Sequence, residues 1–144
     1  MDLRLKVNRV NTVVNKVNKR KETPYKFYQL DIWKDGYKLA MEVYDITDKY
    51  PSEEKYALTS QSRKSVNSVI ANIAEAHGRY RYADKMRVLY IARGEVQETQ
   101  SHLAVAWGRK YIDIKTFQNL SRRYEKLKIG INNYINSIQR KQKQ

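Results

Sequence analysis

The sequence predicts an all-α protein, built as an up-down-up-down four-helix bundle. Its 144 residues include only five Gly and two Pro, so the turn residues that join short strands are scarce. Apolar residues recur in alternating steps of three and four along four long stretches, which is the spacing of helices that bury one face against each other. A chain of this length has room for one domain with a core.

Capping and breaking residues delimit the first two expected helices. Asp31 can cap the first helix, Pro51 ends it, and Ser52 can cap the next segment. The second helix is expected over about residues 59 to 77, with Gly78 just beyond its end in a left-handed conformation. The apolar stripes of these two helices are Leu39, Val43, Ile46 and Tyr50, and then Val66, Val69, Ile70 and Ile73.

Two longer helices should follow. Gly108 sits near the end of the third helix, and Asp113 can cap the fourth. Their apolar stripes are Leu89, Ala92, Val96, Thr99, Leu103 and Ala106, and then Phe117, Leu120, Tyr124, Leu127, Ile131, Tyr134 and Ile138. The connections are short, so consecutive helices should be antiparallel neighbours.

Residues 1–26 stand apart from the bundle, which we assign to residues 27–144 together with a basic C-terminal tail. This N-terminal arm carries +6 of the net charge of +14, and Lys19-Arg20-Lys21 precede a possible hinge at Pro24. Its apolar residues fit an extra amphipathic helix, although its Asn and β-branched residues make it a weak helix alone. They are Leu3, Val7, Val10, Val14 and Val17.

Composition bounds the partners and the compartment. An excess of 29 Lys and Arg over 15 Asp and Glu creates a field that attracts polyanions, of which nucleic acid is the commonest. The chain contains no cysteine, which excludes disulfides, thiolate catalysis and cysteine-ligated zinc. Apolar runs are far too short to cross a bilayer and no secretory signal is recognisable, so we expect a cytoplasmic protein without a membrane partner.

Catalytic motifs are not evident. The two histidines, His77 and His102, do not follow a glutamate by three residues, as a di-iron bundle would require. Glu98 and His102 are i,i+4 neighbours, which is typical of an ordinary pair on a helix surface. No Gly-rich phosphate loop or nucleophile elbow occurs. We therefore expect no enzyme activity, no cofactor and no metal.

A polar seam is expected on the second and third helices. Asn72 and Glu75 lie three residues apart among small side chains that let a neighbouring helix approach closely. A half-buried polar pair needs a partner, and Arg63 and Arg93 are the candidates. Together with Glu98, these residues are expected to fix helix register or subunit packing rather than to perform catalysis.

The run Arg79-Tyr80-Arg81-Tyr82 carries the functional hypothesis. Guanidinium groups can fork onto phosphates, and tyrosine rings offer faces to unpaired bases. In the alternative, the two tyrosines only pack over the end of the bundle. The predicted topology gathers further bases at the same end of the bundle, opposed mainly by Asp84, while acidic residues dominate the other end. The expected nucleic-acid-binding residues are Lys19, Arg20, Lys21, Arg79, Tyr80, Arg81, Tyr82, Lys85, Arg87, Arg140, Lys141 and Lys143.

Several blocks of the sequence resemble one family, the 23S rRNA intervening-sequence proteins. They are Phe27-x-x-Leu30-x-x-Trp33, Tyr56-x-Leu58-x-x-Gln61-x-Arg63, Ala71-Asn72-Ile73-Ala74-Glu75, Gly78-Arg79, and Tyr90-Ile91-Ala92-Arg93-Gly94 with Glu98. The resemblance implies a left-handed four-helix bundle in a homopentameric ring with no known enzymatic activity. Ala76, Glu95 and the arm depart from the family pattern.

The resemblance also suggests a function. A distant branch is similar to accessory variability proteins of diversity-generating retroelements, basic pentamers that bind structured RNA and a reverse transcriptase. We therefore expect a homo-oligomer that binds structured RNA, as an accessory to a reverse transcriptase. The alternative is a docking scaffold that binds a partner helix through the arm.

Overall fold

The computed structural model describes residues 26–144. The expected amphipathic helix at residues 1–22 and the hinge at Pro24 therefore lie outside the described residues. The described chain is all-α, with no strand in this range. The predicted fold class is confirmed to this extent.

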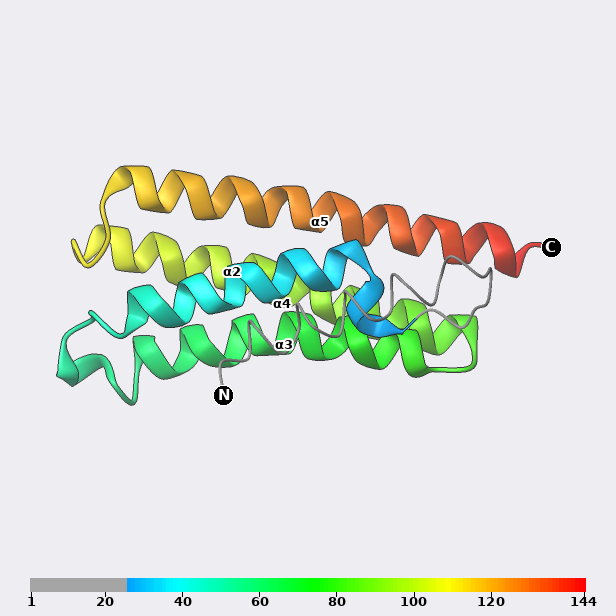
Figure 1. Cartoon of the computed structure of the whole chain (residues 1–144), viewed down its shortest axis with the longest axis horizontal. Helices are drawn as coiled ribbons and strands as arrows, with labels where there is room; N and C mark the ends of the chain where they lie inside the picture. The colour runs from blue at the N-terminus through cyan, green and yellow to red at the C-terminus, as the bar shows by residue number, and fades with distance from the viewer. Residues whose placement is uncertain (1–25) are drawn as a thin grey trace.

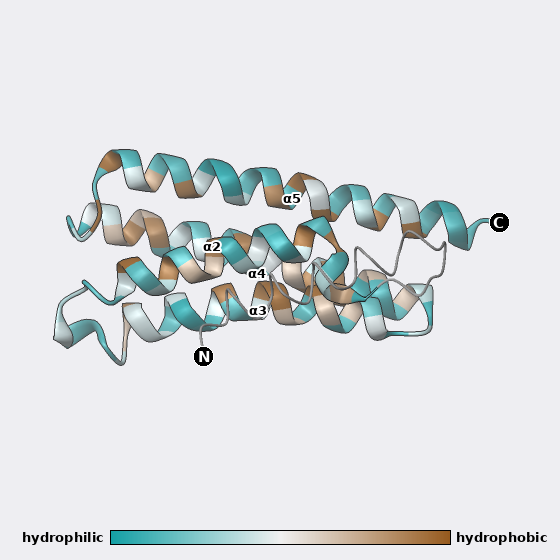
Figure 2. Cartoon of the chain, in the orientation of Figure 1, coloured by the Kyte–Doolittle hydropathy of each residue, from teal (hydrophilic) through white to brown (hydrophobic). Residues whose placement is uncertain are grey.

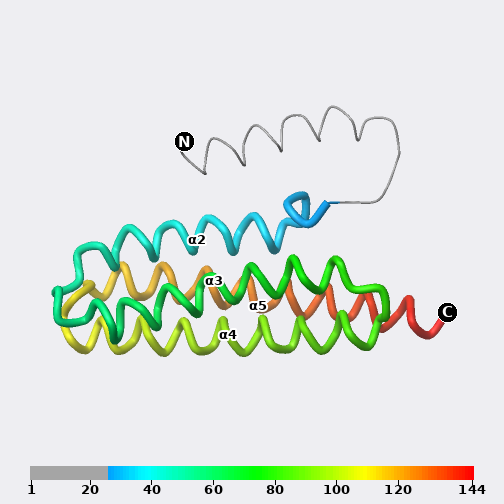
Figure 3. Tube along the Cα trace, turned by 90° about the horizontal axis from the view of Figure 1, so that it is seen from below, coloured from blue at the N-terminus to red at the C-terminus, as the bar shows by residue number. Residues whose placement is uncertain are grey.

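Four long helices run side by side, each antiparallel to the next (Figure 1). Their bounds are α2 Asp31–Thr47, α3 Leu58–Gly78, α4 Tyr82–Gly108 and α5 Ile114–Gln142, with short 3-10 turns at η1 Phe27–Gln29 and η2 Ser52–Glu54. The α3–α4 connection and the end of α5 lie at one end of the bundle, and the start of α2 lies toward the same end but set back from them (Figures 1 and 3). The α2–α3 and α4–α5 connections lie at the other end.

Several predicted helix boundaries were wrong. Leu30, not Asp31, is the N-cap of α2, and Asp31 lies in its first turn. The helix ends at Thr47, well before Pro51, because the amides of Lys49 and Tyr50 bond three residues back and tighten the chain into turns. The next segment is capped by Pro51, with Ser52 as its first residue.

The helix ends also differ from the prediction in where the left-handed backbone occurs. Gly78 is the last residue of α3 and does not have a positive φ, because the chain leaves directly into the extended conformation of Arg79, at φ −75° and ψ 143°. In the described part of the chain, the left-handed residue is Lys110, at φ 65°. The predicted cap of the fourth helix is confirmed, since an Asp113 carboxylate oxygen accepts a hydrogen bond of 2.7 Å from the Thr116 amide.

The apolar stripes meet in one core. Hydrophobic and hydrophilic positions alternate along each helix, as Figure 2 shows most clearly on α5. All six predicted stripe positions of α4 are buried, including Thr99. Phe117, Tyr134 and Ile46 are only partly buried at the edge of the core, and Tyr50 joins Leu58 and Ala106 in a smaller cluster.

Two glycines allow α2 to lie close to its neighbours. A Cβ atom added to Gly36 would lie 2.8 Å from Cγ2 of Ile70 in α3, and one added to Gly130 in α5 would lie 2.9 Å from Cγ2 of Ile32. Contacts this short would force the β-branched methyls to move. Glycine is therefore required at both positions to bring α2 against α3 on one side and α5 on the other.

The core assignment predicts the cost of truncating its leucines. Leu103→Ala and Leu127→Ala should each lower the free energy of unfolding by about 2–5 kcal/mol, because both side chains are almost wholly buried. Ile129, which is 56% exposed on α5, provides the control, and Ile129→Ala should cost less than about 0.5 kcal/mol. Urea denaturation would measure all three. Equal losses in the three variants would mean that the buried faces are misassigned.

Candidate nucleic-acid interface

The α3–α4 connection presents its side chains to solvent. Arg79 and Arg81 both have extended backbone, which directs successive side chains to opposite sides. The Tyr80 side chain between them is 97% exposed, so it does not pack over the end of the bundle. Tyr82, the first residue of α4, is 40% exposed. The connection is therefore an exposed segment of two arginines and a free tyrosine ring.

The charge of Arg79 is partly engaged within the chain. Its guanidinium forms an ion pair with Glu75, one turn back on α3. The hydrogen bond to Glu75 raises the pKa of Arg79, and the negative charge of the carboxylate partly offsets the charge of the guanidinium. Arg81 and Arg87 are exposed and have no ion pair among the described residues.

Lys85 of α4 binds the end of α3 and lies near a lysine of α5. Its Nζ donates hydrogen bonds to the Ala76 carbonyl at 3.2 Å and the His77 carbonyl at 3.0 Å. These carbonyls are in the last turn of α3, where the Ala76 carbonyl also accepts from the Arg79 amide at 3.3 Å. Burial lowers the pKa of Lys85, and the nearby charge of Lys141 on α5 lowers it further. Lys85 thus has a structural role in addition to the predicted binding role.

We call the positive surface at this end of the bundle the basic end. Its opposing carboxylates are Asp31, Glu75 and Asp84, and Glu75 is already paired with Arg79. Lys19, Arg20 and Lys21 lie outside the described residues, in the segment joined to this end through Lys26. The basic end consists of Lys26, Arg79, Arg81, Lys85, Arg87, Arg140, Lys141 and Lys143.

The opposite end is less acidic than expected. Asp48 is paired with Arg63 at 2.7 Å, and Asp113 is used as the cap of α5. Bases are also present there and roughly match the acids in number; they are Lys49, Lys55, Arg109, Lys110 and Lys115. The charge asymmetry of the bundle therefore comes from the excess at the basic end rather than from an acidic opposite end.

The five residues of the expected polar seam do not form one seam in the protomer. Glu75 pairs with Arg79, not with Arg63 or Arg93, because an i,i+4 partner lies within easier reach. The amide of Asn72 donates to the Ser68 carbonyl of its own helix, and Glu98 lies 3.5 Å from His102.

The two arginines of that set join helices separately. The Arg63 guanidinium donates to the Thr47 hydroxyl at 3.0 Å and lies over the Tyr44 ring, so it ties α3 to α2. Arg93 donates to the Asn132 side chain at 2.8 Å and ties α4 to α5. Their structural role is therefore to fix neighbouring helix pairs.

A buried hydroxyl pair was missed by sequence reasoning. The Thr99 hydroxyl donates to the Ser65 hydroxyl at 2.9 Å between α4 and α3, where both residues are buried. The available signal was a threonine in an otherwise apolar stripe and a serine at a small-residue position. Each residue alone is compatible with simple close packing, so only the structure reveals the pair.

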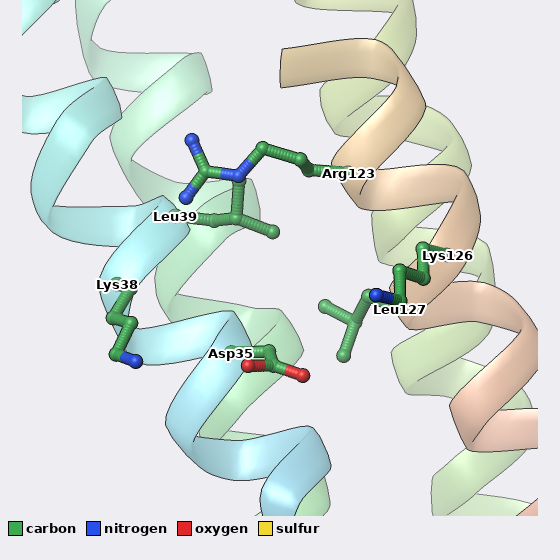
Figure 4. Close-up of a pocket in the computed structure, with 6 residues that line it drawn as sticks. All are labelled: Asp35, Lys38, Leu39, Arg123, Lys126 and Leu127. Carbon is green, nitrogen blue, oxygen red and sulfur yellow. The ribbon is translucent and has the colours of Figure 1, made fainter. Parts of the chain in front are cut away.

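The seam between α2 and α5 contains a shallow hollow (Figure 4). Arg123 and Lys126 of α5 and Asp35 and Lys38 of α2 surround a floor of leucines. Its volume of about 130 Å³ is below the roughly 300 Å³ typical of small-molecule sites. Next to it, Arg123 forms an ion pair with Glu42 at 2.5 Å, which links the two helices. This hollow is therefore part of the helix packing.

In residues 26–144, no group of three or more His, Asp or Glu side chains is arranged to hold a metal ion. None of the helices in the same range is both long and apolar enough to cross a membrane.

The chain matches the 23S rRNA-intervening sequence protein family over residues 28–133, well over half of its length. It belongs to that family. The fold is similar to a crystal structure of a protein with unknown function from the S23 ribosomal protein family of Bacteroides thetaiotaomicron, with a TM-score of 0.68 and 22% identity. The similarity covers 73% of this chain and 95% of that one. No functionally curated protein matches the chain.

The contacts of Lys85 predict that it affects stability more than its neighbour Arg87. Lys85→Ala should lower the free energy of unfolding by about 1 kcal/mol, because the carbonyls of Ala76 and His77 lose a donor. Arg87→Ala removes an equal charge from the same end and should change stability by less than about 0.5 kcal/mol. Urea denaturation of both variants would compare them. Equal stability of the two would show that the carbonyl contacts contribute nothing.

Proposed function

We propose that the protein is a non-catalytic, oligomeric RNA-binding protein that holds RNA phosphates at its basic end. The observation that carries this proposal is the gathering of eight cations from four segments toward one end of the bundle, against three carboxylates. Such a surface would neutralise several phosphates at once, and each neutralised phosphate releases counterions that favour binding.

The electrostatics of Lys85 support an anion at this end. Lys85 and Lys141 are close enough for one to lower the pKa of the other, so their charges oppose each other in the free protein. A phosphate placed between them would remove this repulsion. The fixed position of Lys85 on the α3 carbonyls would keep one of these charges in place for the ligand.

RNA is favoured over duplex DNA because of the exposed tyrosine. Tyr80 offers a free ring beside Arg79 and Arg81, and a ring of this kind stacks on bases that are not paired. Unpaired bases in loops and bulges are typical of structured RNA. An association with a reverse transcriptase stays a prediction, since no contact of the described residues bears on it.

The oligomer is proposed to be a homopentameric ring built on the outer face of α4. This face exposes Tyr90, Ile91 and Val105, each more than 40% exposed, and also Gly94 and Ala104. Small side chains next to apolar ones let another helix pack closely. Exposure of the apolar side chains to water is unfavourable in a monomer. A ring would repeat the basic end, so that several weak phosphate contacts act on one RNA.

The proposed RNA contact predicts a loss of affinity when the two connection arginines are removed. Arg79→Ala together with Arg81→Ala should weaken binding to structured RNAs of unrelated sequence by a similar factor. The slope of log affinity against log salt should become shallower by about one for each lost phosphate contact. Fluorescence anisotropy at several salt concentrations would measure both effects.

Lys49→Ala with Lys55→Ala provides the matched control, because it removes the same charge from the opposite end. This pair should have little effect on affinity. If both pairs weaken binding equally, the attraction is diffuse and the basic end is not the site. If neither pair matters, docking of a protein partner becomes the better account.

The proposed ring predicts that one charge on α4 would disrupt assembly. Ile91→Lys should reduce the mass measured by light scattering from that of an oligomer, since it places an ammonium in an apolar contact. Ile129→Lys, on an exposed position of α5, should leave the mass unchanged. Circular dichroism would show that both variants remain helical. A wild-type protein that is monomeric at micromolar concentration would contradict the ring.

A further inference from the structure

An exposed aromatic pair lies at the end of the bundle opposite the basic end. Trp107, in the last turn of α4, stacks on Phe117 of α5 with ring centroids 5.2 Å apart and an angle of 9° between the planes. The Trp107 side chain is nevertheless 44% exposed. One face of the indole is thus covered by Phe117, and much of the remaining ring is open to solvent.

This indole lines a hollow of about 360 Å³ at the α4–α5 connection, together with Lys110, Tyr111, Ile112 and Asp113. This volume is within the range of small-molecule sites. Because the rings of Trp107 and Tyr111 and the side chain of Ile112 form its walls, it can accept a flat, largely apolar group.

The charged side chains that line the hollow are Lys110 and Asp113. Lys110 and Lys115 form no ion pair among the described residues, although Lys115 helps to lower the pKa of Asp113. The Asp113 carboxylate is occupied by the Thr116 amide. Arg109 lies over the Tyr111 ring and near Glu53 and Glu54. Lys110 is therefore the lining cation that remains for a ligand, whereas Lys115 lines a separate hollow with Glu42 and Asp45.

Lys110 occupies a position that normally requires glycine. Its amide bonds to the Trp107 carbonyl and the Tyr111 amide bonds to the Ala106 carbonyl, which is the Schellman arrangement with Lys110 as its left-handed residue. Any side chain in this conformation is strained. Such strain is found most often where a side chain serves a function. Here it keeps an ammonium-bearing side chain beside the exposed indole.

We propose that this hollow binds an unpaired nucleobase of RNA, with the base stacked on Trp107 and its phosphate near Lys110. The inference rests on the proposed function and adds a second contact. Because α4 has 27 residues, the two sites are separated by roughly 40 Å along the bundle. A nucleotide is favoured over a protein partner because Lys110 lines the same hollow as the exposed ring, whereas the cores of protein interfaces are poor in lysine.

Intrinsic fluorescence tests this site directly. The chain has two tryptophans, and Trp33 is only 9% exposed. The full-length protein would be titrated with a short single-stranded RNA of mixed sequence, and with the same RNA annealed to its complement. We expect the single strand to quench the emission more strongly than the duplex, because only unpaired bases can stack on the indole. Trp33→Phe should keep this quenching.

Two variants separate stacking from charge. Trp107→Leu keeps an apolar contact with Phe117 and should weaken single-strand binding about fivefold or more in fluorescence anisotropy, since stacking of a base is lost. Lys110→Gly should raise the melting temperature by relieving the left-handed strain. It should also make the salt dependence of single-strand binding shallower by about 0.7 in log–log slope.

The outcomes distinguish this site from the basic end. If anisotropy shows RNA binding without quenching, and Trp107→Leu binds as tightly as the wild type, the Trp107 site is wrong while the basic end stands. Equal quenching by duplex and single strand would overturn base stacking. A change in oligomer mass in Trp107→Leu with unchanged RNA affinity would identify a protein interface instead. If no RNA binds at all, both proposals fail.

Discussion

Burial of four apolar stripes in one core is the constraint on which the rest of the structure depends. Short connections allow the stripes to meet only if each helix reverses the direction of the one before it. This reversal brings the start of α2, the α3–α4 connection and the end of α5 toward one end of the bundle (Figure 1). Bases that are far apart in the sequence therefore become neighbours because the core is buried, without any direct attraction among them.

Holding like charges together has a cost, which the core has to offset. The lowered pKa of Lys85 reflects part of it, since burial and Lys141 both disfavour its charged form. The protein moderates this cost locally, through the Glu75 carboxylate beside Arg79 and the α3 carbonyls beneath Lys85. The remaining repulsion favours an anionic ligand, because a bound phosphate would stabilise the charged forms of side chains that repel each other in the free protein.

The sequence was sufficient for the fold class, the buried faces and the location of the basic end. The periodicity of apolar residues predicts burial reliably when a helix has one apolar face, and all predicted core residues of α4 are buried. Helix ends were less accurate, because they depend on hydrogen bonds of single residues; Gly78 was expected to be left-handed, whereas Lys110 is.

The contacts of the polar residues could not be predicted from the sequence. Arg63 and Arg93 were the expected partners of Glu75, and the structure shows that Arg79 pairs with it instead. The exposed indole of Trp107 was missed for a similar reason. From the sequence, an aromatic residue at the end of a helix with an apolar face would be assigned to the core. In the structure, the turn that follows Trp107 leaves part of its side chain exposed.

The hydroxyl pair of Thr99 and Ser65 selects one alignment of α4 along α3. Aliphatic side chains can exchange neighbours with little loss when a helix slides by one turn, so an all-apolar seam would tolerate more than one alignment. A slide of this kind would break the hydrogen bond between the two hydroxyls, at a cost of about 0.5–1.5 kcal/mol, while each hydroxyl kept its bond to a carbonyl of its own helix. The pair therefore discriminates against misaligned packings during folding. By favouring one alignment of α4 along α3, it also favours the position of Lys85 beside the last carbonyls of α3, from which a slide of one turn would move the ammonium by about 5.4 Å.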